Sequence, residues 1–178
     1  MSYAVECYLD DAASETINAL RTLFKKNKIT IDEGTSPHIS LAIYDEIDPE
    51  LFSERIKDFS EVFSSFSFNF MNFGIFPTME SVLFMAPKVS DELLFFHSEF
   101  HKQFKPFSRN LSEYYSPEYW VPHCTIGIYL NKKQIRKAIG LLREIELPMK
   151  AEIREIGVNQ FPPNRELFRY KLNKPTEK

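Results

Sequence analysis

Two short segments of the sequence place a histidine two positions before a hydroxyl residue. Residues 37–44 read Pro-His-Ile-Ser-Leu-Ala-Ile-Tyr, and residues 122–129 read Pro-His-Cys-Thr-Ile-Gly-Ile-Tyr. Of the four histidines, only His38 and His123 are followed at this distance by Ser or Thr, which are Ser40 and Thr125. A single match of this kind is explained by packing. Packing does not explain why histidine and hydroxyl recur together within an eight-residue repeat, so the pair indicates a functional site.

Two imidazoles and two hydroxyls suit phosphoryl chemistry that needs no metal ion. Imidazole titrates near neutral pH, so one ring is able to accept a proton while the other donates one. Hydroxyl groups donate hydrogen bonds to the non-bridging oxygens of a phosphate, where negative charge concentrates. The repeat makes the two histidines equivalent in sequence, and the choice of acid and base stays open.

Both motifs have the alternation of a strand, which places each histidine and its hydroxyl on one face. The small residues that come next in this alternation, Ala42 and Gly127, are expected on the same face, where they would leave room for a cleft. Cys124 falls on the apolar face. We interpret it as a buried small hydrophobic residue and not as a nucleophile.

The rest of the chain alternates between strand-like and helix-like segments, which predicts an α+β fold with a mostly antiparallel sheet. Asp48-Pro49, Ser90 and Asn131 with Gln134 are helix start signals. Strands are predicted at 3–9, 38–44, 66–76, 81–87, 123–130, 149–159 and 166–172, and helices at about 13–26 and after residues 48, 90 and 131.

Composition excludes several classes of protein. The net charge of −3 lacks the basic excess of proteins that bind long duplex nucleic acid. Five glycines disfavour a glycine-rich phosphate loop, and two cysteines are too few for a disulfide framework. No signal peptide or long apolar run is evident, so we expect a cytoplasmic protein without membrane contact. The 17 phenylalanines are expected to fill the core.

The paired His-x-Ser/Thr motifs, 123 − 38 = 85 residues apart, resemble those of the 2H phosphoesterase superfamily. The closest branch is that of the 2′-5′ RNA ligase-like and cyclic phosphodiesterase-like proteins. The resemblance implies one domain over residues 1–178, made of two interleaved, pseudo-symmetric lobes with flanking helices around a central cleft. By the same resemblance His38 and His123 are the acid–base pair, Ser40 and Thr125 contact phosphate, and no metal or other cofactor is needed.

The activity that this resemblance implies is hydrolysis of 2′,3′-cyclic or related cyclic phosphates, or reversible 2′-5′ RNA ligation. The expected partner is a small nucleotide or an RNA end with a cyclic phosphate, and the expected state is a monomer. The alternative is a binding module that holds a phosphorylated nucleotide or RNA terminus without turning it over.

Three other groups of residues offer competing interpretations. His97 and His101 have the spacing of two metal ligands on a helix but lack a third ligand, so we interpret them as packed at the edge of the core. The aromatic residues before the second motif either stack on a base or cover the edge of the lobe. Tyr44 and Tyr129 lie too far along their strands to contact the phosphate. Arg165 and Arg169, in or near the last turn, are candidates to approach a substrate phosphate, and the sequence does not place them.

Overall fold

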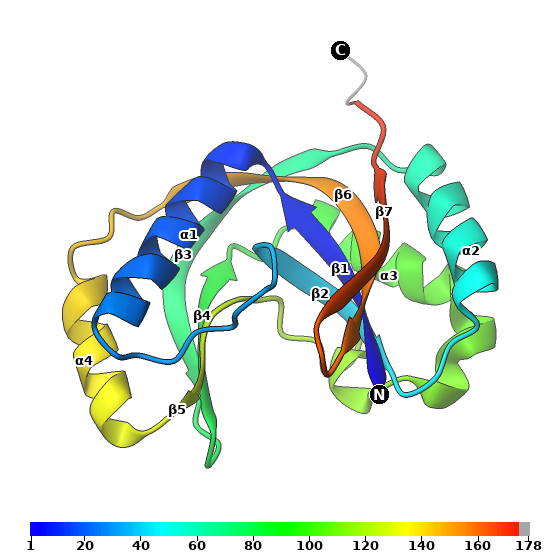
Figure 1. Ribbon diagram of the computed structural model, residues 1–178. Coiled ribbons are helices and arrows are strands. Elements are labelled where there is room, and N and C mark those ends of the chain that lie inside the picture. The colour runs from blue at the N-terminus through cyan, green and yellow to red at the C-terminus, as the bar shows by residue number, and fades with distance from the viewer. Residues whose placement is uncertain (175–178) are drawn as a thin grey trace.

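The computed structural model describes residues 1–174 and has an α+β fold (Figure 1). In this part of the chain, four α-helices accompany one antiparallel sheet of seven strands. The first half comprises β1 (Ser2–Leu9), α1 (Asp11–Lys26), β2 (His38–Tyr44), α2 (Pro49–Val62) and β3 (Phe66–Phe76). The second half repeats this order with β4 (Ser81–Pro87), α3 (Asp91–Gln103), β5 (Cys124–Leu130), α4 (Lys132–Leu142) and β6 (Met149–Phe161), and β7 (Arg165–Lys171) follows.

All the predicted strands and helices are present, with bounds within two residues of those expected. The start signals work as predicted, because Asp48, Ser90 and Asn131 each accept a backbone N–H of the first helical turn. Gln134 completes a capping box by accepting the backbone N–H of Asn131 at 3.1 Å. The segment between α3 and β5 contains two short 3₁₀ helices, η1 (Lys105–Asn110) and η2 (Glu113–Tyr115).

The two halves exchange strands within the sheet, whose order is β2-β1-β6-β3-β4-β5 with β7 added beside β6. Strand β3 of the first half pairs with β4 of the second, while β6 of the second half pairs with β1 of the first. The motif strands β2 and β5 therefore stand at opposite ends of the strand order.

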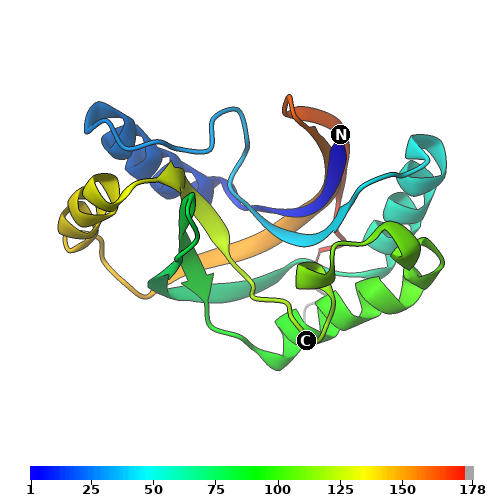
Figure 2. The ribbon, with the colours of Figure 1, turned by 90° about the horizontal axis from the view of Figure 1, so that it is seen from below.

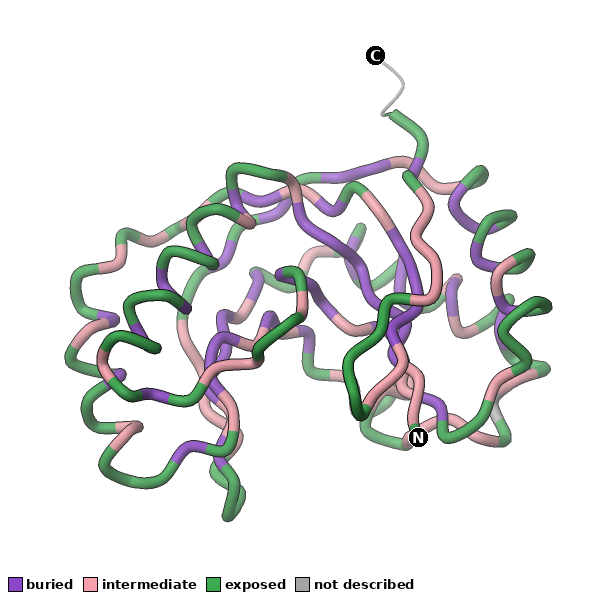
Figure 3. The backbone as a smooth tube through the Cα atoms, in the orientation of Figure 1, coloured by how far each residue is buried: buried purple, intermediate pink, exposed green. Residues whose placement is uncertain are grey.

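The helices form two pairs that flank the curved sheet (Figures 1 and 2). Helices α1 and α4 lie together, and the Lys137 ammonium donates to the carbonyl of Asn27 at 2.8 Å. Helices α2 and α3 lie together on the other flank, where the ring of Phe59 packs edge-on against those of Phe96 and Phe100. Burial follows this arrangement, with the strands and inner helix faces buried and the outer helix faces exposed (Figure 3).

Phenylalanine fills the core, as predicted. Ten of the phenylalanines belong to the buried set, which joins the sheet to the inner faces of all four helices. The buried phenylalanines are Phe24, Phe52, Phe59, Phe66, Phe68, Phe70, Phe84, Phe96, Phe100 and Phe104.

In the described residues, none of the helices has the length and apolar character that crossing a bilayer requires.

Candidate active site

The structure brings the four motif residues to one cleft with a volume of about 920 Å³. His38 and Ser40 come from the start of β2, and Thr125 comes from the start of β5, directly after His123 and Cys124. Although β2 and β5 end the strand order on opposite sides, both line this cleft. Two motifs 85 residues apart thus share one site.

Both imidazoles are held by the same backbone contact. Nδ1 of His38 lies 2.7 Å from the carbonyl oxygen of Ser36, and Nδ1 of His123 lies 2.6 Å from that of Val121. A carbonyl oxygen only accepts, so in each ring Nδ1 carries the hydrogen. The Nε2 atoms are therefore the positions at which a proton is taken up or given away.

The surroundings of the two histidines differ. Nε2 of His38 lies 3.4 Å from the Glu6 carboxylate on β1, and both side chains are almost fully buried. The ring of His123 instead packs against the rings of Phe76 and Phe84, with centroid distances of 5.0 and 5.3 Å. Burial is the main cause that lowers the pKa of His123, and the nearby positive charge of His38 contributes to the same direction. The histidines are equivalent in sequence but not in environment.

The expected positions of Ala42 and Gly127 are wrong, because each motif strand contains a β-bulge. On β2, Glu6 pairs with Ser40 and Val5 with Ala42, so Leu41 is an extra residue. On β5, Phe84 pairs with Thr125 and Leu83 with Gly127, so Ile126 is the extra residue at the equivalent position of the repeat.

A bulge reverses the alternation of side chains along the strand beyond it. As a result Ile43 and Ile128 line the cleft, while Ala42 and Gly127 are buried.

The carbonyls beside the bulge of β2 are bound by side chains of other elements. The indole N–H of Trp120 donates to the carbonyl of Ser40 at 3.0 Å. Nε2 of His97 and Nε2 of His101 lie 3.2 and 3.1 Å from the carbonyl oxygen of Leu41. The ring of His97 also stacks on that of Trp120, with centroids 3.7 Å apart. His97 is buried and His101 half-buried, which confirms that both pack at the edge of the core.

The bulge of β5 is held by a buried arginine of α1. Arg21 is 4% exposed and donates to the carbonyls of Thr125 and Thr35 at 2.7 and 2.8 Å. The carbonyls of Ser40 and Thr125 are thus each fixed by a side chain from outside the sheet, and their side chains line the cleft.

The aromatic residues before the second motif divide into two sets. Trp120 and Tyr115 are half-buried and belong to the wall behind β2, whereas Tyr114 and Tyr119 are 80% and 55% exposed. All four line the cleft. Trp120 and Tyr115 therefore cover the edge of the lobe, and stacking of a base on the exposed Tyr114 and Tyr119 stays a prediction.

The two tyrosines that end the motifs also differ. Tyr44 is buried in the core, while Tyr129 is 62% exposed and lines the cleft. Tyr129 has a φ of 54°, a left-handed backbone that non-glycine residues seldom adopt. A second irregularity in the pairing of β4 with β5 lies between Gly127 and Leu130 and returns Tyr129 to the cleft.

The charged groups that line the cleft are the two histidines and three acids. Within residues 1–174, the cleft lining contains no lysine or arginine, and the acids are Glu6, Asp32 and Glu33. Arg169 lies outside it. Its guanidinium stands 3.5 Å from the ring centroid of Tyr8 and binds Glu155 and Glu166.

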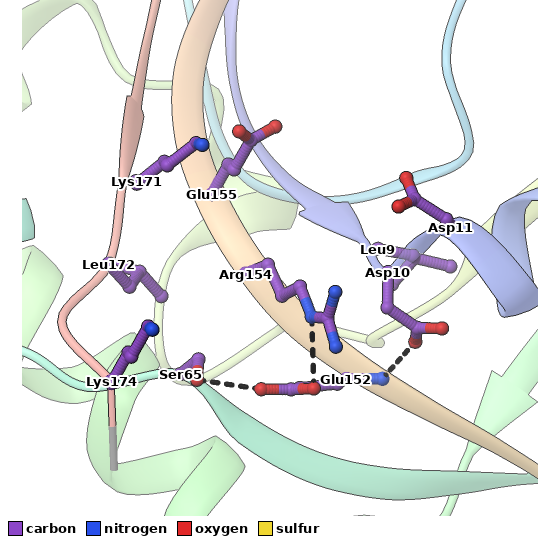
Figure 4. A pocket seen from close by; sticks show the side chains of 10 residues that line it. All are labelled: Leu9, Asp10, Asp11, Ser65, Glu152, Arg154, Glu155, Lys171, Leu172 and Lys174. Carbon is purple, nitrogen blue, oxygen red and sulfur yellow. Dashed lines mark hydrogen bonds and ion pairs between the residues drawn. The ribbon is translucent and has the colours of Figure 1, made fainter.

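A second pocket of about 700 Å³ lies where β1 and β7 end and near the beginning of β6 (Figure 4). The two carboxylates that the dashed lines join to other groups, those of Asp10 and Glu152, accept hydrogen bonds from within the protein. Asp10 accepts the backbone N–H of Glu152 at 2.7 Å, and Glu152 accepts from Ser65 and Arg154 at 2.7 and 3.0 Å. These contacts tie the start of α1 to β6, so we interpret this pocket as structural.

The sequence interpretation missed Glu6 and Arg21, although each has a signal. Glu6 is an acid within the apolar run Tyr3 to Leu9, and Arg21 stands between Leu20 and Phe24 on the buried stripe of α1. Charged residues are rarely buried without a partner, so such positions point to a specific contact. The partners themselves are not visible without the fold.

Comparison with known proteins adds to this geometry. The profile of the 2′-5′ RNA ligase superfamily matches residues 9–160. The Thermus thermophilus protein TT0787 superimposes with a TM-score of 0.71 at 11% identity, covering 99% of this chain and 100% of that one. LigT of E. coli in its apo form gives a TM-score of 0.66 at 14% identity, with coverages of 97% and 98%. LigT complexed with 3′-AMP gives 0.62 at 13% identity, with coverages of 97% and 97%. Among curated proteins, no match was found.

Proposed function

Because the chain belongs to the 2′-5′ RNA ligase superfamily, we propose that it is a metal-independent phosphoesterase that opens a 2′,3′-cyclic phosphate on a nucleotide or an RNA end. The observation that carries this proposal is that two imidazoles at one cleft make the same hydrogen bond to the backbone. Each Nδ1 is bound to a carbonyl two residues earlier, which leaves each Nε2 for proton transfer. The structure of LigT complexed with 3′-AMP supports a ligand of nucleotide size.

The reaction needs one proton to be taken up and one to be given away. Nε2 of one histidine accepts a proton from water, and the water oxygen forms a bond to phosphorus. The bond from phosphorus to one ribose oxygen breaks, and that oxygen takes the proton from Nε2 of the other histidine. The product is a phosphomonoester, and proton exchange with solvent resets both imidazoles.

In the proposed reaction the hydroxyls of Ser40 and Thr125, which both line the cleft, bind the non-bridging oxygens of the phosphate. Such bonds strengthen as negative charge builds on these oxygens in the transition state. If the 5′-hydroxyl of a second RNA end replaces water as the incoming group, its oxygen forms the bond to phosphorus and gives its proton to one histidine. The bond from phosphorus to the 3′-oxygen breaks, that oxygen takes the proton of the other histidine, and the product is a 2′-5′ phosphodiester.

Substitution of either histidine tests the proposal. Wild-type protein, His38→Ala and His123→Ala are incubated with a panel of 2′,3′-cyclic nucleotides in the presence of EDTA, and products are separated by chromatography. We expect turnover by the wild type and a loss of at least ~100-fold in each variant, because general acid–base catalysis contributes roughly 10²–10⁴-fold. Circular dichroism spectra like that of the wild type show that the variants fold.

Two outcomes would contradict the proposal. Tight binding of cyclic phosphates without turnover would favour the binding module, and activity that requires added zinc would exclude the metal-independent mechanism. A parallel incubation with RNA ends bearing a cyclic phosphate and a free 5′-hydroxyl measures ligation directly.

A further inference from the structure

The two halves of the molecule differ at one position beside each catalytic motif. On β1, Glu6 pairs with Ser40, and on β4, Phe84 pairs with Thr125. These are equivalent places in the repeat, immediately before the bulge of each motif strand. One half therefore presents a carboxylate to its histidine, and the other half presents a phenyl ring.

Glu6 is directed at His38 by its surroundings. It is 3% exposed, and its Oε1 lies 3.4 Å from Nε2 of His38, the ring nitrogen that is not bound to the Ser36 carbonyl. In the described part of the chain, His38 is the one basic side chain within ion-pair distance of Glu6. A buried carboxylate without a partner is costly, so this contact also explains how Glu6 is accommodated.

The other titratable groups around Glu6 do not replace His38 as its cationic partner. Burial raises the pKa of Tyr8 above its ordinary range, and the charge of Glu6 and a hydrogen bond between the two side chains act in the same direction. Burial with a smaller contribution from Glu6 raises the pKa of Tyr115 to about 12. Both phenols are therefore uncharged at neutral pH. Cys7 is a buried thiol whose pKa is also raised by burial, and the guanidinium of Arg169 binds Glu155 and Glu166.

The surroundings of His123 favour the opposite charge state. Its ring lies against Phe76 and Phe84, which cannot accept a hydrogen bond as a carboxylate does. Burial in this apolar setting disfavours the imidazolium and leaves Nε2 with a free electron pair.

We propose that Glu6 gives the two histidines different roles, by holding a proton on Nε2 of His38, which acts as the general acid, while His123 acts as the general base. This inference rests on the proposed function and deepens it. Water is then deprotonated on the His123 side of the phosphate, and the leaving ribose oxygen is protonated on the His38 side. Glu6 is a positioning residue, since it acts through His38 and not on the substrate.

The order in which the histidines lose their protons is the first test. Long-range ¹H–¹⁵N spectra of the imidazoles, recorded from pH 4 to 9, report the titration of each ring without any substrate. We expect His38 to keep its proton to a higher pH than His123. The reverse order in the wild-type protein would overturn the proposal without any variant, and it would leave the proposed phosphoesterase activity untouched.

Glu6→Gln is the second test, because it removes the charge and keeps the size. We expect the titration of His38 to move to lower pH, that of His123 to move by less, and the alkaline limb of the kcat/KM profile to move with His38. Glu33→Gln removes an acid from the rim of the same cleft and should move neither histidine. An acidic limb that moves as far as the alkaline limb, or equal shifts of both histidines, would overturn the proposal.

A third variant covers the case in which Glu6→Gln does not fold. Glu6→Asp keeps the charge but withdraws it from Nε2 by about the length of one C–C bond, so the His38 titration should move in the same direction by a smaller amount. An unchanged His38 titration in Glu6→Asp, together with the reverse order in the wild type, would show that Glu6 has only a structural role.

Discussion

At the scale of single residues, the most informative contact is the bond from each Nδ1 to a carbonyl two residues earlier. It fixes the tautomer of the ring, since Nδ1 must donate. It also survives protonation of Nε2, because Nδ1 keeps its hydrogen in the imidazolium. Each histidine is therefore able to exchange a proton at Nε2 without changing its attachment to the backbone.

Loss of either motif hydroxyl is expected to weaken catalysis without abolishing it. Hydrogen bonds to charged groups contribute about 1.5–3 kcal/mol. Ser40→Ala and Thr125→Ala should therefore lower kcat/KM for a cyclic nucleotide by roughly 10- to 100-fold. Thr78→Ala is a suitable control, because Thr78 lines the same cleft but its hydroxyl already donates to the carbonyl of Glu80 at 2.9 Å. Wild-type kinetics in Ser40→Ala and Thr125→Ala would remove both hydroxyls from the mechanism.

At the scale of elements, the paired bulges decide what each motif strand presents to the cleft. Leu41 and Ile126 are extra residues at the same position of the repeat, and each turns the following isoleucine into the cleft. Helix α3 holds the bulge of β2 through His97 and His101, and α1 holds that of β5 through Arg21. Helices α1 and α3 thus cover the core and also bind the backbone carbonyls at the two bulges.

This arrangement makes the fold sensitive to acid. Burial is the main cause that lowers the pKa of His97 from 6.5 to about 3, and burial lowers the pKa of His101 in the same direction. Between pH 6.5 and 3 the unfolded chain binds a proton at His97 that the folded protein does not. The free energy of unfolding therefore falls as the pH is lowered through this window, by about 2 kcal/mol between pH 7 and 5 for His97 alone.

Thermal unfolding measures this effect. The midpoint should fall by several degrees between pH 7 and 5 in the wild type, as a change of 1 kcal/mol shifts the midpoint of a domain of this size by about 2–4 °C. In His97→Gln, whose amide does not titrate, the fall should be smaller. Equal slopes in the two proteins would show that another group causes the acid sensitivity.

At the scale of the whole molecule, the cleft handles phosphate with little positive charge. Its described lining has two histidines and three acids but no lysine or arginine, and the chain as a whole carries a net charge of −3. Under the proposed function, we expect binding to depend on hydrogen bonds and on a protonated histidine. Such a site suits a cyclic phosphodiester, which carries one negative charge, better than a polyanion.

A weak dependence on salt is the expected result. Affinity for a nucleic acid falls steeply with salt only where several lysines or arginines neutralise phosphates. For a short RNA ending in a cyclic phosphate, KM should rise by no more than about 3-fold between 50 and 200 mM NaCl, the change expected for one neutralised phosphate. A much larger rise in KM would show that basic residues outside the cleft hold the strand. In that case Lys132→Gln with Lys133→Gln would be the variant to compare, since both lie at the exposed start of α4.

The elements, the α+β class and the two motifs are predictable from the sequence, because they depend on contacts within a few residues. Strand alternation, helix caps such as Asn131 with Gln134, and the repeat around His38 and His123 are all local patterns. The folded chain was needed to show that the motif strands share a cleft, that bulges turn Ile43 and Ile128 into it, and that Glu6 lies beside His38. A bulge is a property of two paired strands, and the partner of a buried charge lies far away along the chain. Neither follows from the order of residues in one segment.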